Sequence, residues 1–439
     1  MVTLENIAEV VSDGLCTGCG ACVGVCPTNA IQMHLSNSLL LPCVDDSKCV
    51  RCLKCVQCCS GHSLDLAGLN SSVFGKQPED ILIGSYSNCY LGHSNDAEVT
   101  SVSSSGGIVE QVLIYLLENR LIDYALTARA ARENPLMPES SFASTREEIL
   151  SSSGSKYCPV ATDVALKKIM AEDKKFAFVG LPCHIHSLRK AERVFKGLRG
   201  KIVLHIGLFC GHTVNFDGTF LVLKKLAVSE NEVARLRYRG NEHPDHMLIE
   251  LRDGQRKKIR FNRNWNAYWN LFAPFFFTPV RCLMCPDHFN ELADMSVGDA
   301  WLQELRNSST AESIVVSRTE IAEKTLVDMR TRGLLTLKLL SQEKVKASQA
   351  FSLNFKKENL PGRLSFFRAL GKSTPTMDCT VQNSSKLLGL ISGFLSYLSF
   401  RVSSSKHLSL LLLYVPLPIF RLYFGFFVCV FQMSTRIRS

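Results

Sequence analysis

Two sets of equally spaced cysteines constrain this chain of 439 residues more than any other feature. The first set follows the pattern C-x2-C-x2-C-x3-C-P, and the second set repeats its spacing. In such a repeat, three thiolates of one run hold a four-iron cluster and the fourth crosses to the other cluster. The spacing therefore predicts two [4Fe-4S] clusters. The predicted ligand sets are Cys16, Cys19, Cys22 and Cys59 for one cluster, and Cys49, Cys52, Cys55 and Cys26 for the other.

The two copies of this motif differ in detail. In the first copy, Gly18 and Gly20 lie between ligands, where a tight loop brings backbone N–H groups toward the cluster sulfurs. In the second copy, Ser60 stands where the first has proline, and an additional thiol, Cys58, precedes Cys59, so the choice between these two cysteines stays open. Zinc also accepts four thiolates from C-x2-C pairs. Two matching runs of four favour a two-cluster ferredoxin domain over zinc.

Length, leader and charge limit the class of protein. A chain of 439 residues suits two or three domains. Residues 1–15 lack the basic start, apolar run and cleavage site of an export signal, so we expect reduced thiols in the cytoplasm. Of the net charge of +10, residues 371–439 supply seven basic residues against one acidic residue. The remainder is mildly basic and has no basic stripe interleaved with aromatics, which argues against a nucleic-acid partner.

A helix is predicted after residues 103–107, because Val109, Val112, Leu113, Leu116 and Leu117 recur at helical spacing. Residues 103–107, SSSGG, supply a cap and an open backbone at its start. A helix N-terminus of this kind presents unpaired N–H groups to a phosphate. The alternative is a cap with no ligand.

Two later segments, 175–183 and 201–211, are predicted to be buried strands flanking a helix, which makes a parallel βαβ unit. Each segment ends near a cysteine, so Cys183 and Cys210 are expected at one carboxyl edge of the sheet, where open α/β sheets bind ligands. A C-x2-C pair, Cys282 and Cys285, follows. Together the four predict a third tetrathiolate site. The alternatives are ordinary buried thiols with a turn, or a redox disulfide.

The order of these motifs resembles the coenzyme F420 hydrogenase/dehydrogenase beta-subunit family, which also includes 7-hydroxymethyl chlorophyll a reductase. The resemblance covers about residues 1–350 and rests on the ferredoxin repeat, SSSGG, GSKY (154–157), GLPCHIHSLRK (180–190), IGLFCG (206–211) and CLMCPDHFNELADMSVGD (282–299). It implies an FAD-containing iron–sulfur oxidoreductase. Such a protein passes electrons between a two-electron carrier, often reduced coenzyme F420, and one-electron centres. The same resemblance implies that Cys183, Cys210, Cys282 and Cys285 hold a cluster beside the flavin.

The resemblance also implies which residues contact the flavin. The implied FAD contacts are Ser104, Ser105, Gly106, Gly107, Lys156 and Tyr157, with Asp299 as a further candidate. Lys156 is assigned the stabilisation of the anionic reduced flavin, and the alternative is a solvent-facing lysine. His184 and His186 are candidates for a proton relay, because imidazole titrates near neutrality, and the alternative is a hydrogen-bonded structural role.

The expected fold is a multidomain protein of mixed α+β and α/β class. A ferredoxin domain with two [4Fe-4S] clusters is expected over residues 1–70 and an α/β FAD-binding domain with parallel strands over 71–275. A domain carrying the C-x2-C pair follows over 276–365, and a basic hydrophobic tail over 366–439. The aromatic run at 264–277 is assigned to core packing, and the alternative is a ring-stacking surface for a deazaflavin or chlorin. Five cysteines lack partners by spacing and are expected to be free thiols: Cys43, Cys89, Cys158, Cys379 and Cys429.

The tail contains two apolar segments, residues 386–400 and 408–431. The second is long enough to cross a bilayer but is interrupted by Pro416, Pro418 and Arg421. Its basic flanks suit an anionic cytoplasmic leaflet. We expect a monotopic or re-entrant membrane anchor, and the alternative is a helical pair buried against the protein or a partner.

Three functions are compatible with these features. The first is an enzyme, a cytoplasmic flavin and iron–sulfur oxidoreductase that is peripheral at the membrane and uses F420 or ferredoxin as its redox carrier. The second is an electron-transfer subunit that has no substrate site and feeds a partner oxidoreductase subunit. The third is a zinc-stabilised binding module, which predicts a colourless protein without flavin.

Overall fold

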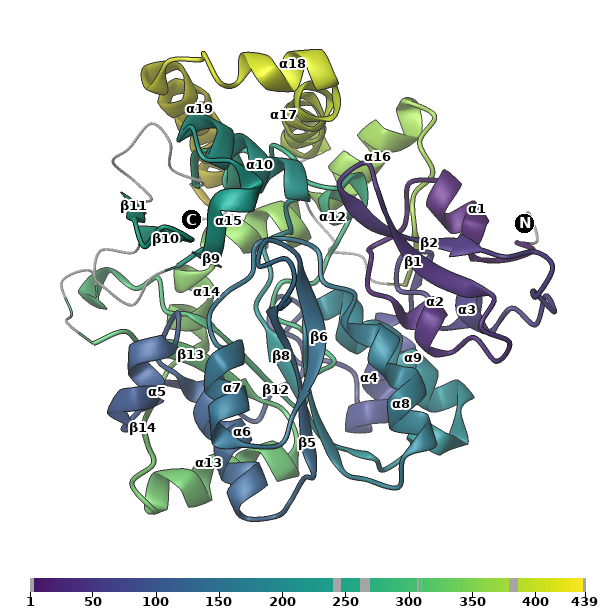
Figure 1. Cartoon of the computed structure of the whole chain (residues 1–439), viewed down its shortest axis with the longest axis vertical. Helices are drawn as coiled ribbons and strands as arrows, with labels where there is room; N and C mark the ends of the chain where they lie inside the picture. The colour runs from purple at the N-terminus through teal and green to yellow at the C-terminus, as the bar shows by residue number, and fades with distance from the viewer. Residues whose placement is uncertain are drawn as a thin grey trace.

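The computed structural model describes residues 4–239, 246–260, 269–305, 308, 310–378 and 386–436. Its centre is a mixed sheet of eight strands in the order β14-β4-β13-β12-β8-β7-β5-β6 (Figure 1). In chain order these strands are β4 (Asn88–Ser94), β5 (Tyr124–Ala130), β6 (Pro138–Ala143), β7 (Phe176–Gly180), β8 (Ile202–Leu208), β12 (Met295–Asp299), β13 (Ser313–Ser317) and β14 (Leu335–Leu339).

The middle of this sheet is parallel. Strands β5, β7, β8 and β12 pair in parallel, whereas β6 and the three strands beyond β12 pair antiparallel. Gly180 of β7 lies opposite Gly207 of β8, so the residues that follow both strands emerge at one edge. The predicted βαβ unit is therefore confirmed, with α9 (Pro182–Val194) as its crossover helix.

Helices cover both faces of the sheet (Figure 1). On one face α6 (Ile108–Glu118), α7 (Arg146–Ser152) and α13 (Glu320–Thr331) share an apolar core with Ala177 of β7. On the other face α4 (Leu66–Phe74), α8 (Leu166–Ala171) and α9 pack on Phe176 and Phe178. Neighbouring side chains of β7 thus pack in the cores on opposite faces of the sheet, because side chains alternate between the two faces along a strand.

The N-terminal unit lies beside α9, on the right in Figure 1. Its elements are α1 (Ile7–Ser12), α2 (Ala21–Gly24), β1 (Ile31–Ser36), β2 (Leu39–Val44), α3 (Lys54–Gln57) and β3 (Ser63–Leu64). Strands β1 and β2 form an antiparallel hairpin, and β3 pairs in parallel with β15 (Thr376–Met377). This pairing connects the N-terminal unit with residues more than 300 positions later in the chain.

Smaller elements surround the carboxyl edge of the sheet. A three-stranded antiparallel sheet contains β9 (Val233–Arg237), β10 (His246–Leu251) and β11 (Arg256–Arg260). Short helices near it are α5 (Ala97–Val102), α10 (Phe216–Lys225), α11 (Trp269–Phe272) and α12 (Val280–Leu283). Single turns of 3-10 helix lie at Thr162–Ala165, Lys196–Leu198, Glu230–Glu232 and Gln303–Leu305. Within the aromatic run, the described side chains from Leu271 to Phe277 are buried, and residues 264–268 lie outside the described residues.

The C-terminal part is helical. It comprises α14 (Gln342–Ser348), α15 (Ala350–Leu353), a π-helical turn (Asn354–Glu358), α16 (Leu360–Ala369), α17 (Lys386–Ser404), α18 (Lys406–Leu411) and α19 (Leu417–Arg436). Helix α17 packs closely on α16, because a Cβ atom added to Gly389 would lie 2.6 Å from the Cα atom of Gly362. Among the described helices, α17 alone is long and apolar enough to span a bilayer, and 44% of its apolar window is buried within the protein. This packing agrees with the buried-pair alternative for α17.

Candidate functional site

The first three cysteines and Cys59 lie together. Burial raises the pKa of Cys16 to about 12, and negative charge on Cys59 adds to this effect. Burial also raises the pKa values of Cys19 and Cys22, again with a contribution from Cys59. The structure therefore brings together the four thiols of the first predicted ligand set. A bound iron cluster would favour their thiolate forms, because thiolates are the iron ligands.

Cys58 and Cys59 face different surroundings. Cys58 is fully buried in an apolar cluster with Leu66 and Leu69. Burial raises the pKa of Cys58 to about 12. Cys59 instead faces the other three thiols of its set, and its Sγ atom accepts from the His62 backbone N–H at 3.4 Å. This geometry favours Cys59 as the ligand and Cys58 as a packing residue.

The second set lies farther out. Cys26 and Cys55 are buried in the apolar cluster that also contains Cys22 and Cys59 of the first set, Cys49 packs against this cluster, and Cys52 is exposed. Burial of Cys26 is outweighed by backbone N–H donors, beginning with that of Thr28, which lower the pKa of its thiol. N–H groups directed at a cysteine sulfur are the interactions that stabilise a cluster thiolate. The surroundings of Cys26 thus suit a cluster ligand.

The third predicted set surrounds one cavity of about 50 Å³ at the carboxyl edge of the sheet. Cys183 begins α9 after β7, Cys210 follows β8, and Cys282 and Cys285 lie in and after α12. Burial raises the pKa of Cys183, and the charges of the other cysteines raise it further. Among the described residues, no three His, Cys, Asp or Glu side chains are grouped as ligands of a single metal ion. All four thiols of the third predicted set line this one cavity.

Buried cations accompany this cavity. Lys356, on the π-helical turn, lies with its Nζ atom 3.5 Å from Cys285 Sγ and donates to the Asp287 carbonyl at 2.6 Å. Burial disfavours the charge of Lys356, yet nearby thiols, led by Cys285, raise its pKa above the ordinary value. Arg363 lies close enough to feel the charge of Cys285 as well. Positive charge here would offset the negative charge of four thiolates. Sequence reasoning missed Lys356, because it lies outside every motif.

A short polar path joins the first and third sets. The Sγ atom of Cys19 lies 3.5 Å from Ser187 Oγ on α9. Ser187 donates to Ser60 Oγ at 2.9 Å, and Ser60 donates to the carbonyl of Cys183 at 2.9 Å. The first cysteine set thus reaches the backbone of the third set through two serines.

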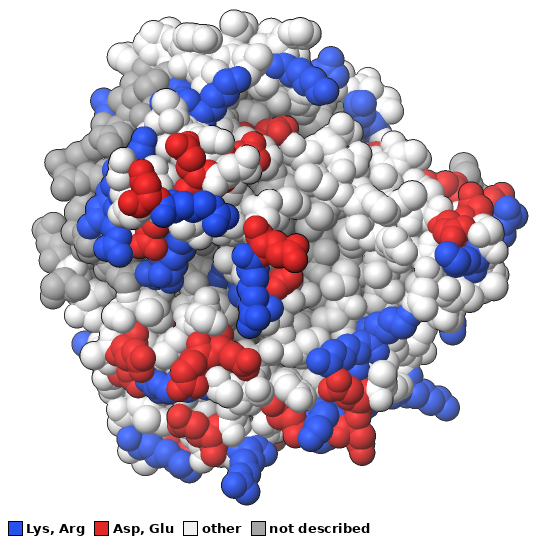
Figure 2. Space-filling model, viewed as in Figure 1, with Lys and Arg blue, Asp and Glu red and all other residues white. Residues whose placement is uncertain are grey.

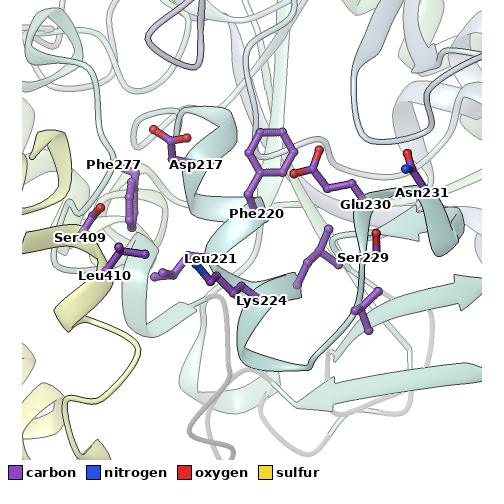
Figure 3. A pocket seen from close by; sticks show the side chains of 12 residues that line it. Asp217, Phe220, Leu221, Lys224, Ser229, Glu230, Asn231, Phe277, Ser409 and Leu410 are labelled. Atoms are coloured by element: carbon purple, nitrogen blue, oxygen red, sulfur yellow. The ribbon is translucent and has the colours of Figure 1, made fainter. Parts of the chain in front are cut away.

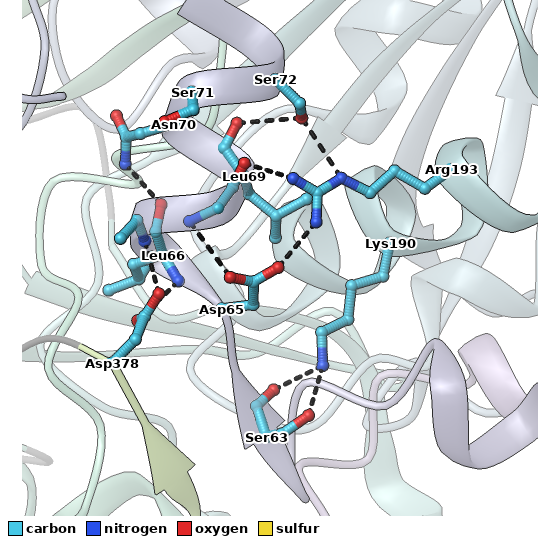
Figure 4. A network of polar contacts seen from close by, with 12 residues as sticks. Ser63, Asp65, Leu66, Leu69, Asn70, Ser71, Ser72, Lys190, Arg193 and Asp378 are labelled. Atoms are coloured by element: carbon cyan, nitrogen blue, oxygen red, sulfur yellow. Dashed lines mark hydrogen bonds and ion pairs between the residues drawn. The ribbon is translucent and has the colours of Figure 1, made fainter. Parts of the chain in front are cut away.

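Further polar contacts hold the N-terminal unit against α9 (Figure 4). Lys190 donates to Ser63 and also to the Cys59 carbonyl at 2.9 Å. Arg193 pairs with Asp65 at 2.6 Å. Cys183, Ser187 and Lys190 are spaced by four and three residues, so they lie on one face of α9. This face is the junction between the N-terminal unit and the sheet.

The glycines and serines predicted to contact FAD lie at the start of α6. Gly107 is the N-cap residue with φ +73°, and Gly106 donates to Ser313 Oγ at 2.9 Å. Ser104 Oγ accepts from the backbone N–H of Ser155 at 2.8 Å. Ser105 Oγ donates to the Glu312 carbonyl at 3.1 Å. The structure thus brings SSGG and GSKY together, although 50 residues separate them.

Lys156 lies in a small pocket of about 30 Å³ whose lining includes Arg237 and Arg239. Burial lowers the pKa of Lys156 to about 8; the Glu110 carboxylate opposes this shift, and Arg237 and Arg235 add to it. Lys156 donates to the carbonyls of Ser152 and Ser153, so it is not the solvent-facing lysine of the alternative. Sequence reasoning missed these arginines. They alternate along the end of β9 in the sequence ARLRYRG, and this alternation could have indicated a cationic pocket.

Tyr157 and Asp299 meet next to this pocket. The Tyr157 ring lies 5.1 Å from that of Phe272, and the Asp299 carboxylate pairs with Arg239 at 2.5 Å. Cys158, expected to be a free thiol, lines the cavity of the third set. Residues 154–158 therefore run from the cationic pocket to the cysteine cavity. Of the other expected free thiols, Cys43 and Cys429 are exposed, Cys89 is buried, and Cys379 lies outside the described residues.

His184 and His186 line the cysteine cavity. His184 Nδ1 accepts from the Leu181 backbone N–H at 3.2 Å, and burial lowers the pKa of His184 to about 4. Burial also holds the pKa of His186 well below its usual value. Both rings are therefore neutral at pH 7. The contact of His184 with its own helix start matches the structural alternative more closely than a proton relay.

The fold, the sheet-edge cavity and the ferredoxin-type cysteines define an iron–sulfur protein of the oxidoreductase type. Residues 89–167 and 173–343 match the family models for the N-terminal and C-terminal parts of the coenzyme F420 hydrogenase/dehydrogenase beta subunit, and residues 9–32 match a 4Fe-4S binding domain. The chain belongs to the coenzyme F420 hydrogenase/dehydrogenase beta-subunit family. It therefore contains a 4Fe-4S binding domain at its N-terminus, as the sequence predicts.

Several known proteins are similar to this chain. The coenzyme F420 hydrogenase subunit beta of Methanothermobacter thermautotrophicus is 27% identical over 286 residues, covering 61% of this chain and 95% of that protein. The coenzyme F420-dependent sulfite reductase of Methanocaldococcus jannaschii is 27% identical over 333 residues, covering 73% of this chain but 46% of the reductase. A chain of the F420-reducing [NiFe] hydrogenase complex from Methanosarcina barkeri has the same fold, with a TM-score of 0.54 and 20% identity, covering 68% of this chain and 98% of that chain.

Proposed function

We propose that the chain is an iron–sulfur flavoprotein that passes electrons between a two-electron carrier and one-electron iron–sulfur centres. The observation that carries the proposal is the contact between the first and third cysteine sets, in which Ser187 and Ser60 join Cys19 to the backbone of Cys183. Clusters this close would conduct single electrons from the N-terminal unit to the sheet edge. The relatives named for coenzyme F420 favour reduced F420 as the two-electron carrier.

FAD is the proposed link between the two kinds of transfer, because a flavin exchanges hydride and also releases electrons singly. The pocket beside GSKY offers positive charge for the pyrophosphate of such a dinucleotide, because Arg237 and Arg239 line it. The ion pair with Asp299 holds Arg239 at the same pocket. Lys156 is the candidate for favouring negative charge on the reduced ring. Lys356 is the candidate for offsetting the negative charge of the thiolates at the third cysteine set.

An electron-transfer subunit without its own substrate site is the second candidate. Several relatives carry subunit names, which favours a partner oxidoreductase subunit for this chain too. Turnover separates the two candidates. If the purified chain alone oxidises reduced F420 with a soluble acceptor, it is an enzyme in its own right. If turnover begins only when a partner protein is added, it is a transfer subunit.

Metal and flavin analysis of the anaerobically purified chain tests the proposal itself. We expect about twelve irons, about twelve sulfides and about one FAD per chain, because three four-iron clusters and one flavin are proposed. The protein should be brown and should bleach on reduction. A preparation with neither sulfide nor flavin would contradict the proposal, and one with zinc in their place would favour the binding module.

Peripheral attachment to a membrane is proposed for the tail. Helices α17 to α19 form the uppermost part of the molecule in Figures 1 and 2, where uncharged surface adjoins basic side chains. Leu422 is 77% exposed and Phe426 is 54% exposed on α19, and Arg421 beside them is also exposed. A groove of about 500 Å³ lies between α10 and α18, lined in part by Leu410 and Phe277 (Figure 3). Exposed apolar side chains next to basic residues suit an anionic bilayer surface.

Replacing Leu422 and Phe426 by glutamate should strongly weaken this attachment. Burying each apolar side chain contributes about 1.5–3 kcal/mol, so the double variant should bind vesicles at least about tenfold more weakly. Flotation with vesicles that contain anionic lipid measures the bound fraction. Leu339→Glu is the matched control, because Leu339 is 72% exposed on β14. Equal flotation of the wild type and the double variant would exclude α19 as the anchor.

A further inference from the structure

The two cysteine loops of the N-terminal unit share a backbone but not a sequence. In the first loop Gly18 and Gly20 have φ values of +73° and +87°. The equivalent residues of the second loop are Arg51 and Leu53, with φ values of +49° and +61°. Left-handed backbone favours glycine, and bulky side chains seldom adopt it. The second loop therefore keeps two large side chains where its backbone would favour glycine.

The surroundings explain why the first loop has glycine. A Cβ atom on Gly20 would lie 2.7 Å from Val164 Cγ1, and one on Gly18 would lie 3.0 Å from the Leu40 carbonyl oxygen. The first loop is thus packed against other parts of the chain. In the second loop Val50 is 62% exposed and Leu53 is 38% exposed. Arg51 and Leu53, the two residues with left-handed backbone, and Val50 beside them therefore display side chains toward solvent.

The two loops also differ in their place along the proposed electron path. Cys19 of the first loop contacts Ser187, which leads to the third cysteine set. Cys52 of the second loop is exposed. If both clusters are present, the first is the inner one and the second is the outer one. Electrons would enter or leave the chain beside Cys52.

From these observations we infer that Val50, Arg51, Cys52 and Leu53 form a docking patch for a small one-electron iron–sulfur carrier protein. This inference rests on the proposed function and names its second partner. In each encounter the carrier's cluster loses one electron and the outer cluster gains one, or the reverse, and no bond or proton changes. Two encounters supply the electron pair of the two-electron carrier.

Apolar contact is the basis of this recognition. Two of the basic side chains around the patch already pair within the chain: Lys48 with Asp45 at 2.8 Å and Arg51 with Glu5 at 3.6 Å. Val50 and Leu53 are the exposed apolar side chains next to Cys52. Weak redox encounters bury less than about 1,200 Å², so a few apolar side chains over a cluster are sufficient. Binding of this kind should depend little on salt.

The double variant Val50→Thr, Leu53→Gly tests the inference. It gives the second loop the residues that the first loop has as Thr17 and Gly20. Glycine suits the left-handed backbone, so the outer cluster should be retained. Stopped-flow mixing with a reduced two-cluster bacterial ferredoxin should show a second-order rate at least about tenfold lower than that of the wild type. Reduction by dithionite and the iron content should not change, and Leu121→Ser, at a residue that is 45% exposed elsewhere, should behave as the wild type.

The possible outcomes separate this inference from the proposed function. An unchanged ferredoxin rate in the double variant, with iron intact, overturns the docking patch alone. A wild-type rate that falls more than about tenfold between 50 and 200 mM salt overturns its apolar basis. A wild-type protein that lacks iron, or that dithionite does not reduce, overturns the proposed function and the docking patch together. Should the double variant lose iron, Leu53→Gly alone is measured against the same criteria.

Discussion

Replacing Cys183 by alanine should remove the third cluster and leave the two N-terminal clusters in place. The iron content should fall from about twelve to about eight atoms per chain, because one four-iron cluster is lost. Electron transfer from ferredoxin to the two-electron carrier should fall by at least about 100-fold, since the path from Cys19 through Ser60 would end at an empty cavity. Iron analysis and low-temperature EPR of the reduced protein measure the first effect, and steady-state turnover measures the second.

A second thiol in the same cavity provides the matched control. Cys158 is buried and lines the cavity, but it belongs to none of the predicted ligand sets. Cys158→Ala should therefore keep about twelve irons and most of the turnover. Unchanged iron and EPR spectrum in Cys183→Ala would show that the third site is wrong. Loss of iron in Cys158→Ala instead would show that Cys158, and not Cys183, is the ligand of the third cluster.

The spacing of the cysteines was enough to predict the first two ligand sets, because all eight thiols belong to two copies of one short motif. The third set was reached differently. Cys183 and Cys210 follow neighbouring parallel strands, and the register of β7 with β8 does place their carboxyl ends side by side. Parallel pairing across a βαβ unit is a local rule. It could bring two of the four cysteines together. The C-x2-C pair was added as a candidate without any local rule to place it there, and the family resemblance then supported the complete set.

Charges that arrive from distant segments could not be predicted. Lys356 reaches Cys285 from a π-helical turn 71 positions later in the chain. No periodicity marks such a contact, because it depends on how α14 to α16 pack. The arginines at the end of β9 alternate in the sequence and could be noticed there. Lys156, which lines the same pocket, comes from a loop about 80 residues earlier. Contacts of this kind belong to tertiary packing, and one sequence does not specify them.

The tail shows the limit of hydrophobicity as a signal. A helix that packs on its own protein and one that contacts lipid can have the same composition. Helix α17 packs through Gly389 against Gly362, which is a specific close contact. Helix α19 buries Phe420 and Phe427 and exposes Leu422. One face of the tail thus packs on the protein, and the exposed face of α19 is the part to which the proposed membrane attachment applies.

Replacing the neighbouring residues Cys58 and Cys59 by alanine, one at a time, should change the iron content in only one of the two variants. Cys59→Ala should lose the inner cluster, about four irons, and with it nearly all electron transfer to the third site, because Cys59 completes the set of Cys16, Cys19 and Cys22. Cys58→Ala should keep about twelve irons, since Cys58 packs with Leu66 and Leu69.

The cost of Cys58→Ala should be limited to about 1 kcal/mol of stability, because a small buried group is removed from an apolar cluster. Iron and sulfide analysis, EPR and thermal unfolding of the two proteins, prepared side by side without oxygen, measure these differences. The opposite pattern, with iron lost from Cys58→Ala and kept in Cys59→Ala, would make Cys58 the ligand. The last turn of the second motif would then have to rotate to bring Cys58 out of its apolar cluster toward Cys16, Cys19 and Cys22, and Cys59 into it.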